Sequence, residues 1–95
     1  MQNNLLKGKT AVITGCNRGI GKSILQKFSE QGANSIACVR ETNNEFQKLC
    51  KNLENKYKIK IDIISFDLSK KDQLSEGISK ILDLKKRVDI LVNNA

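Results

Sequence analysis

The sequence contains no histidine and no proline, and aromatic residues make up 4% of its 95 residues. Without histidine, the chain has neither a histidine metal ligand nor a histidine general base, so we expect no metal site. So few aromatic side chains provide no stacking platform for single-stranded nucleic acid. No Pro-rich or Ser- and Gly-rich linker divides the chain, and its length suffices for one modest core, so we expect a single domain.

Long apolar runs are also missing. No stretch approaches the roughly 18 apolar residues of a membrane span. The N-terminus lacks the apolar segment and small-residue cleavage site of a secretory signal peptide. Hydrophobic residues account for 39% and charged residues for 28% of the chain, which is typical of a globular protein in water. We therefore expect a cytoplasmic protein that does not bind membranes.

Neither the cysteines nor the basic residues indicate a special function. The three cysteines form an odd set without paired spacing, which argues against a disulfide framework. Cys38 and Cys50 are predicted to be small buried apolar residues, whereas Cys16 either is reactive or fills a position where a loop requires a small side chain. The net charge of +7 comes from scattered lysines, which favours a solvated surface over nucleic-acid binding.

Apolar patterning alternates between strand and helix types. Residues 10–14, 35–39, 59–66 and 88–92 are predicted strands. Apolar residues three and four positions apart predict helices from Gly19 to Gln31, from a capping box at residues 42–45, and from Ser69. The predicted buried helix faces are Ile20, Ile24, Leu25 and Phe28; Phe46, Leu49, Cys50, Leu53 and Tyr57; and Leu74, Ile78, Ile81 and Leu82.

This alternation predicts an α/β fold with a doubly wound, Rossmann-type parallel sheet. Right-handed crossovers place the strands in the order 3-2-1-4. The third strand alternates apolar and polar residues, as a half-exposed edge strand does, while the other strands are apolar throughout. The predicted domain is residues 1–95, which form the first βαβαβαβ part of a fold of this type that is cut short at its C-terminus.

A glycine-rich turn joins the first strand to the first helix. Gly15 permits the tight turn, Gly19 lets the backbone approach a pyrophosphate, and Gly21 lets the helix pack close to the sheet. The N-terminus of the helix offers free N–H groups to the phosphates. This placement at the head of a βαβ unit predicts a dinucleotide site.

The motif Thr14-Gly15-x-x-x-Gly19-Ile20-Gly21 resembles the coenzyme motif of the short-chain dehydrogenase/reductase family. Asp67 after the third strand is similar to that family's adenine-contacting acid, and Asn93-Asn94-Ala95 resembles the start of its N-N-A-G motif. The resemblance covers the whole chain. Within the family, the residues of these motifs are most similar to those of bacterial 3-oxoacyl-acyl-carrier-protein reductases. It implies a cofactor site formed by Gly15, Asn17, Arg18, Gly19, Ile20, Gly21, Arg40, Asp67, Leu68, Asn93 and Ala95, with Thr14 bracing the turn against Asn93 and Asn94.

Asp67, Asn93 and Asn94 also have purely structural interpretations. Asp67 could be a turn former or the first residue of a helix, and the two asparagines could simply end a strand.

The end of the second strand bears on coenzyme choice. An acidic residue there would accept hydrogen bonds from the ribose of NAD, but the sequence has Val39 followed by Arg40. A guanidinium suits the 2′-phosphate of NADP, and Arg18 could reach the same phosphate. Glu41 could instead take the ribose role. We predict NADP as the coenzyme, with NAD the less favoured alternative.

The family's catalytic serine, tyrosine and lysine follow the N-N-A-G motif, so the resemblance implies that no catalytic residue lies in these 95 residues. The longer protein is expected to reduce a small-molecule or acyl-carrier-bound carbonyl substrate as a homo-oligomer, commonly a tetramer. The alternatives are a non-catalytic dinucleotide-binding or sensing module and, less favoured, a nucleic-acid-associated domain.

Overall fold

Strands and helices alternate along the whole chain in the computed structural model, which describes residues 4–94. The elements are β1 (Thr10–Thr14), α1 (Gly19–Glu30), β2 (Asn34–Val39), α2 (Asn44–Tyr57), β3 (Ile61–Ser65), α3 (Lys71–Asp83) and β4 (Ile90–Val92). All strand pairs are parallel, and their order is β3-β2-β1-β4, which confirms the predicted doubly wound topology. Because every strand pair is parallel, the carboxyl ends of all strands lie at one edge of the sheet.

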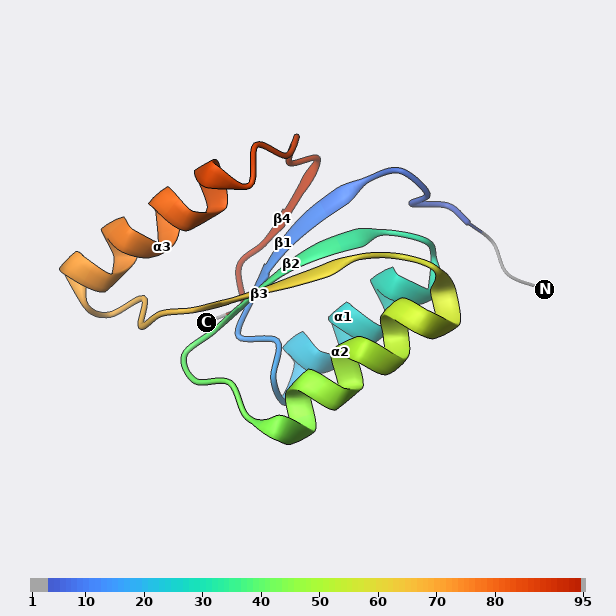
Figure 1. Cartoon of the computed structure of the whole chain (residues 1–95), viewed down its shortest axis with the longest axis horizontal. Helices are drawn as coiled ribbons and strands as arrows, with labels where there is room; N and C mark the ends of the chain where they lie inside the picture. The colour runs from blue at the N-terminus through green and yellow to red at the C-terminus, as the bar shows by residue number, and fades with distance from the viewer. Residues whose placement is uncertain (1–3, 95) are drawn as a thin grey trace.

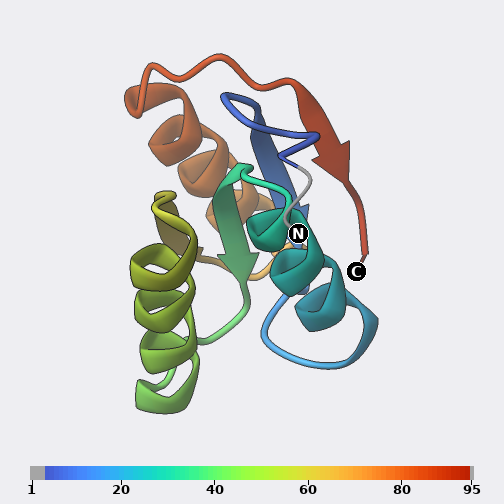
Figure 2. The same cartoon turned by 90° about the vertical axis from the view of Figure 1, so that its right-hand side faces the viewer.

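The helices lie on both faces of the sheet. Figure 1 shows α1 and α2 side by side on one face and α3 on the other. Figure 2 shows the sheet between these two layers, with β4 next to β1. A parallel strand needs both faces covered, because the crossover helices that connect such strands lie on the faces.

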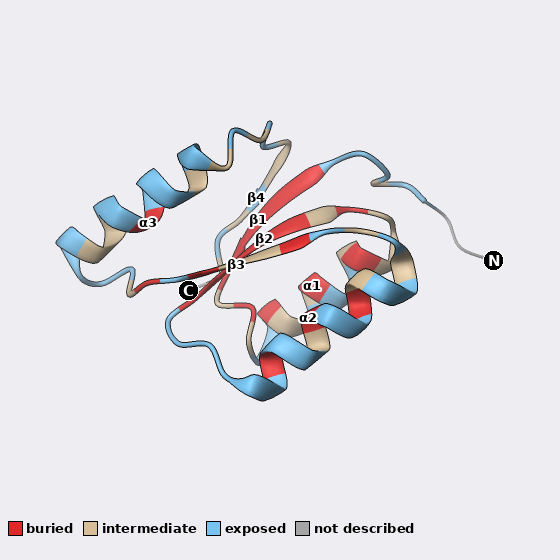
Figure 3. Ribbon diagram, in the orientation of Figure 1, coloured by how far each residue is buried: buried red, intermediate tan, exposed pale blue. Residues whose placement is uncertain are grey.

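Two apolar cores follow from the alternation of side chains along each strand. Ala11, Ile13, Ala37 and Val39 pack toward α1 and α2, while Val12, Ile36, Cys38 and Ile64 pack toward α3. Consecutive residues of a strand point to opposite faces, so β1 and β2 are apolar at every position apart from small polar residues. Figure 3 shows the buried residues concentrated on the strands and on the inner helix faces.

The predicted face of α2 is confirmed, but its predicted cap is shifted by one residue. Phe46, Cys50 and Leu53 are buried against the sheet. The N-cap is Asn43, whose side chain accepts a hydrogen bond from the N–H of Phe46 at 2.8 Å. Thr42 therefore does not cap the helix, because Asn43 already satisfies the free N–H group.

The buried face of α3 differs from the prediction. The helix begins at Lys71 rather than at Ser69, and no side chain caps it. Gly77 is buried in contact distance of the Phe66 ring, and this close approach turns Leu74 and Ile81 toward the sheet. This orientation of the helix leaves Ile78 and Leu82 exposed, so the prediction that these two residues belong to the core was wrong.

The first turn of α1 and the lengths of β3 and β4 also differ from the prediction, and β3 covers Ile61–Ser65 within the predicted 59–66. Ile20 in the first turn of α1 is 73% exposed, so the buried face of that helix begins at Gly21. The fourth strand is shorter than predicted, and its Leu91 is 70% exposed on the α3 side of the sheet because α3 packs against β3 instead. The described helices include none that is both long enough and apolar enough to span a bilayer.

Candidate functional site

The glycine turn is where β1 meets α1, at the carboxyl edge of the sheet. Gly15 and Gly19 have φ values of 62° and 60°, a backbone region that favours glycine. A Cβ at Gly21 would overlap the carbonyl oxygen of Gly15 and approach Asn94 Nδ2 to 2.6 Å. Nothing lies within 4 Å of the place that a Cβ at Gly19 would take. Gly21 therefore allows close packing, and Gly19 leaves open space beside the backbone.

Thr14 joins the end of β1 to the segment after β4, as the resemblance implied. Its Oγ1 accepts a hydrogen bond from the N–H of Asn94 at 2.9 Å and lies 3.4 Å from both the Val92 carbonyl oxygen and Asn93 Oδ1. Asn94 Nδ2 donates to the Gly15 carbonyl at 3.3 Å. Both asparagines thus hold the glycine turn as well as following a strand.

The N-terminus of α1 faces the open side of this turn. Its N-cap is Arg18, which has an extended backbone, and no side chain caps the helix. The first turn carries no acidic residue. The free N–H groups and the positive end of the helix dipole are therefore available to an anion.

Two adjoining hollows lie over the carboxyl edge. One, of about 460 Å³, is lined by Gly15, Asn17, Arg18, Gly19, Arg40 and Asn94. The other, of about 320 Å³, is lined by Gly15, Cys38, Val39, Arg40, Phe66, Asp67, Leu68 and Ser69. Gly15 and Arg40 line both, so the two form one extended recess. We call the first the loop hollow and the second the strand-end hollow.

Arg40 and Asp67 meet at the strand-end hollow. The neighbouring strands β2 and β3 end side by side, which places Arg40 Nε 3.3 Å from Asp67 Oδ2. The Arg40 side chain is 77% exposed and the Asp67 side chain is 13% exposed. Hydrogen bonds from the hydroxyl and the backbone N–H of Ser69 lower the pKa of the Asp67 carboxyl, and Arg40 lowers it further. Asp67 is therefore both a turn former and an ionised group in the recess.

The structure brings together most of the residues expected in a cofactor site. Gly15, Asn17, Arg18, Gly19, Arg40, Asp67 and Leu68 all line the recess, and Asn93 is tied to its rim through Thr14. The Asn17 side chain donates to the Glu41 carbonyl at 3.3 Å, which links the glycine turn to the segment after β2. Ile20 and Gly21 lie outside the lining of either hollow, and Ala95 lies outside the described residues.

Four residues that line the strand-end hollow were not among the expected site residues: Cys38, Val39, Phe66 and Ser69. In the loop hollow, Asn94 was expected to brace the turn and not to line the site. Cys38 and Val39 end β2, and Phe66 follows β3 directly. Their signal in the sequence was position at a strand end, since parallel strands deliver such residues to one edge. Cys38 had been predicted only as a buried apolar residue, Phe66 only as the end of a strand, and Ser69 only as a helix start.

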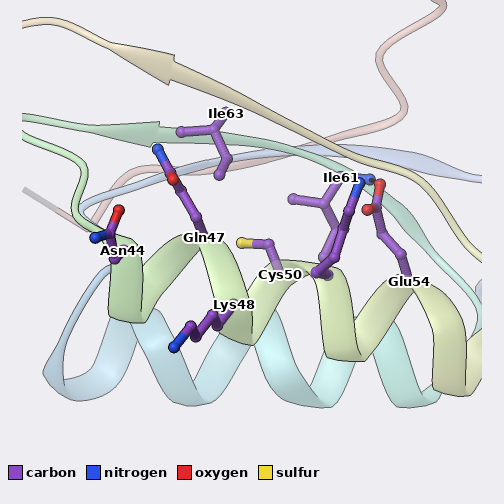
Figure 4. Close-up of a pocket in the computed structure, with 8 residues that line it drawn as sticks. Asn44, Gln47, Lys48, Cys50, Glu54, Ile61 and Ile63 are labelled. Atoms are coloured by element: carbon purple, nitrogen blue, oxygen red, sulfur yellow. Dashed lines mark hydrogen bonds between the residues drawn. The ribbon is translucent and has the colours of Figure 1, made fainter.

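A larger hollow of about 480 Å³ lies elsewhere, between α2 and the edge strand β3. Figure 4 shows the Cys50 sulfur directed into it, toward the strand that carries Ile61 and Ile63, while Lys48 points away. Glu54 Oε2 accepts a hydrogen bond from the N–H of Ile61 at 2.9 Å, which protects the start of this edge strand. None of the glycine-turn residues lines this hollow, so we do not assign the coenzyme to it.

All three cysteines are free and buried, as expected for Cys38 and Cys50. Cys16 is also fully buried, and its Sγ lies 3.9 Å from the Cys38 carbonyl oxygen, which fits the interpretation as a small space-filling residue. Burial raises the pKa of the Cys16 thiol to about 12 and the pKa of each of the other two to about 11. Among the described residues, no group of three potential metal ligands is gathered in one place.

We expect the folded chain to resist thiol reagents. The thiolate is the reactive form, and at pH 8 a thiol with a pKa of about 11 is ionised roughly one part in a thousand. Burial also keeps the reagent away from the sulfur atoms. A chromogenic disulfide reagent should modify the native protein far more slowly than glutathione in the same buffer, and should modify all three thiols in denaturant. A native thiol that reacts as fast as glutathione would contradict this burial.

A family model described as short chain dehydrogenase matches residues 9–95. The curated relatives include 3beta-hydroxysteroid dehydrogenase 2 of Eggerthella lenta, 39% identical over 98% of this chain and 35% of that protein. The 3-oxoacyl-acyl-carrier-protein reductase FabG of Chlamydia muridarum is 37% identical over 98% of this chain and 37% of that protein. The chain thus spans about a third of the length of these relatives.

Solved structures share the fold of this chain. L-sorbose reductase from Gluconobacter frateurii, complexed with NADPH and L-sorbose, has a TM-score of 0.84 and 27% identity over 100% of this chain and 35% of that chain. An alcohol dehydrogenase from Thermococcus sibiricus, complexed with 5-hydroxy-NADP, has a TM-score of 0.83 and 30% identity over 92% of this chain and 37% of that chain.

Proposed function

Because this chain belongs to the short-chain dehydrogenase family, whose members are oxidoreductases, we propose that it is the coenzyme-binding part of an NADP-dependent reductase. The observation that carries the proposal is Arg40, which lines both hollows of the recess at the end of β2. A guanidinium at this point can bind a 2′-phosphate, whereas NAD has no phosphate there to bind.

The chain's own residues fit a dinucleotide. In the proposal, the open backbone at Gly19 and the N-terminus of α1 hold the pyrophosphate, with Asn17 and Arg18 on the rim. The strand-end hollow, bordered by Asp67 and Leu68, receives the adenine. Asn93 is proposed to lie near a ribose of the cofactor, and Ala95 is proposed as a cofactor-binding residue on the resemblance alone. When bound, NADPH supplies a hydride to a carbonyl carbon, and these residues contribute binding and orientation.

The substrate proposed for the longer protein is a carbonyl compound. A 3-oxoacyl group on acyl carrier protein is the first candidate, because relatives 33% and 37% identical to this chain are named as reductases of that group. A homo-oligomeric state, as the resemblance implies, and a cytoplasmic location, as the sequence predicts, complete the proposal. The only tyrosine, Tyr57, packs against the core on the α1 and α2 side and does not line either hollow.

Binding measurements test the coenzyme proposal directly. We expect calorimetric titration of the 95-residue chain at fixed ionic strength to show tighter binding of NADP than of NAD. We also expect no oxidation of NADPH above a buffer blank with any carbonyl compound, because no tyrosine acid lines the recess. Equal affinity for both coenzymes would remove the NADP assignment, and steady NADPH oxidation would contradict the division between coenzyme binding and chemistry.

A further inference from the structure

Asp67 pairs with Arg40 in the strand-end hollow. Its Oδ2 lies 3.3 Å from Arg40 Nε, and its Oδ1 accepts hydrogen bonds from the N–H and hydroxyl of Ser69 at 2.9 and 2.7 Å. The Ser69 contacts fix the carboxylate on the segment after β3, so Arg40 is the movable partner of the pair. The Arg40 side chain is mostly exposed and the Asp67 side chain mostly covered, which agrees with this division.

We propose that Asp67 restrains the preference of this chain for NADP by pairing with Arg40. This inference rests on the proposed function, since it concerns the guanidinium that would bind the 2′-phosphate. A phosphate that approaches Arg40 meets a donor group already engaged by a carboxylate. It also meets the negative charge of that carboxylate, so both effects act against NADP. NAD has no group at this position and is not affected by either.

A carboxylate can also hold an arginine in a productive position, and that effect would favour NADP. Magnitudes decide between the two. Exposed ion pairs hold their partners weakly, so the positional benefit for a 77% exposed arginine is small. A bound phosphate must share this one guanidinium with the Asp67 carboxylate, and this cost to NADP is larger than the small positional benefit. Removal of the Asp67 charge should therefore strengthen NADP binding.

Asp67→Asn is the sharpest variant because the amide keeps the shape and the Oδ1 acceptor for Ser69. Any contact of residue 67 with the adenine is shared by both coenzymes, so its loss cancels in the ratio of their dissociation constants. We expect the ratio of Kd for NAD to Kd for NADP to rise roughly two- to five-fold, the range of a partly exposed ion pair. Asp89→Asn is the matched control, because Asp89 pairs with Arg87 at 3.1 Å but lines a different hollow, with Lys9 and Lys60.

The same substitution in an Arg40→Ala background separates the ion pair from direct repulsion. We expect the rise in the ratio to be clearly smaller there, because the competition for the guanidinium is gone. An unchanged or lower ratio in Asp67→Asn, or an equal rise in both backgrounds, would overturn the inference. If Asp67→Asn does not fold by circular dichroism, Asp67→Ser removes the same charge and takes its place.

The Arg40→Ala variant alone keeps the two proposals apart. If it weakens NADP selectively while Asp67→Asn leaves the ratio unchanged, only the present inference fails. If Arg40→Ala weakens NAD and NADP equally, the proposed NADP function itself fails, and the inference fails with it.

Discussion

Gly21→Ala is expected to destabilise the chain by about 3 kcal/mol or more. The new Cβ would overlap the carbonyl oxygen of Gly15 and lie 2.8 Å from its carbonyl carbon. Both are backbone atoms, so the strain cannot be relieved by a side-chain rotation. The better helix propensity of alanine, about 1 kcal/mol, does not offset this overlap. For a domain of this size the loss corresponds to a fall in Tm of roughly 12–24 °C, measured by circular dichroism.

Two other glycines supply matched controls. Gly19→Ala and Gly8→Ala both place a methyl group in open space at a positive φ, of 60° and 80°, so each should cost only about 1–2 kcal/mol of stability. Gly19 lines the loop hollow, whereas Gly8 lies in a hollow with Lys9 and Lys60, away from the glycine turn. Gly19→Ala should therefore weaken NADP binding about tenfold or more, and Gly8→Ala should leave it unchanged.

These three variants separate packing from binding. A Gly21→Ala protein that melts with the wild type would show that α1 does not need its close approach to the turn. Equal coenzyme affinities for the Gly19→Ala and Gly8→Ala proteins would show that the pyrophosphate does not lie beside Gly19.

Arg40→Ala is expected to weaken NADP binding by one to two orders of magnitude. Charge-assisted contacts contribute about 1.5–3 kcal/mol, and about 1.4 kcal/mol is tenfold in affinity. The Arg40 side chain is 77% exposed and already paired with Asp67, so we expect the lower end of this range. NAD affinity should barely change. Titration of both coenzymes against wild type and variant at one salt concentration measures the difference.

Two controls make this result specific. Arg87→Ala removes the same charge from an 88% exposed arginine that is also paired with an aspartate, but in a hollow that shares no lining residue with the recess. It should leave both affinities unchanged. Arg40→Lys keeps the charge and loses the planar fork, so it should retain part of the NADP preference. A substitution at Val39 is less informative, because Val39 is 2% exposed within the core. Equal losses of NAD and NADP in Arg40→Ala would make Arg40 a structural residue.

Local rules explain what could be predicted from the sequence. Strand β1, the glycine turn and α1 are contiguous, and each has its own pattern, so their order and their likeness to a dinucleotide site were visible without a structure. The strand order followed because right-handed crossovers leave few alternatives. The N-cap of α2 was nevertheless predicted at Thr42, one residue before the actual cap at Asn43. Both residue types cap helices well, and spacing alone does not separate them.

The rotation of α3 was not predictable in the same way. Leu74, Ile78, Ile81 and Leu82 share a helical period, and hydrophobicity alone favoured all four as core. The contact of Gly77 with the Phe66 ring selects the actual face, because a residue without a Cβ allows the closest approach of helix and sheet. That contact joins separate elements and has no signature in a single segment of sequence.

The sequence by itself determined the order of the elements, the glycines of the turn and the basic residue after β2. These depend on backbone conformation and on spacing along one segment. Only the tertiary structure decided that Arg40 meets Asp67, that Thr14 binds the backbone of Asn94, and that Cys16 is buried. The physical reason is that parallel pairing of β1, β2, β3 and β4 brings together strand ends that are distant along the chain, and which side chains then touch depends on register and packing.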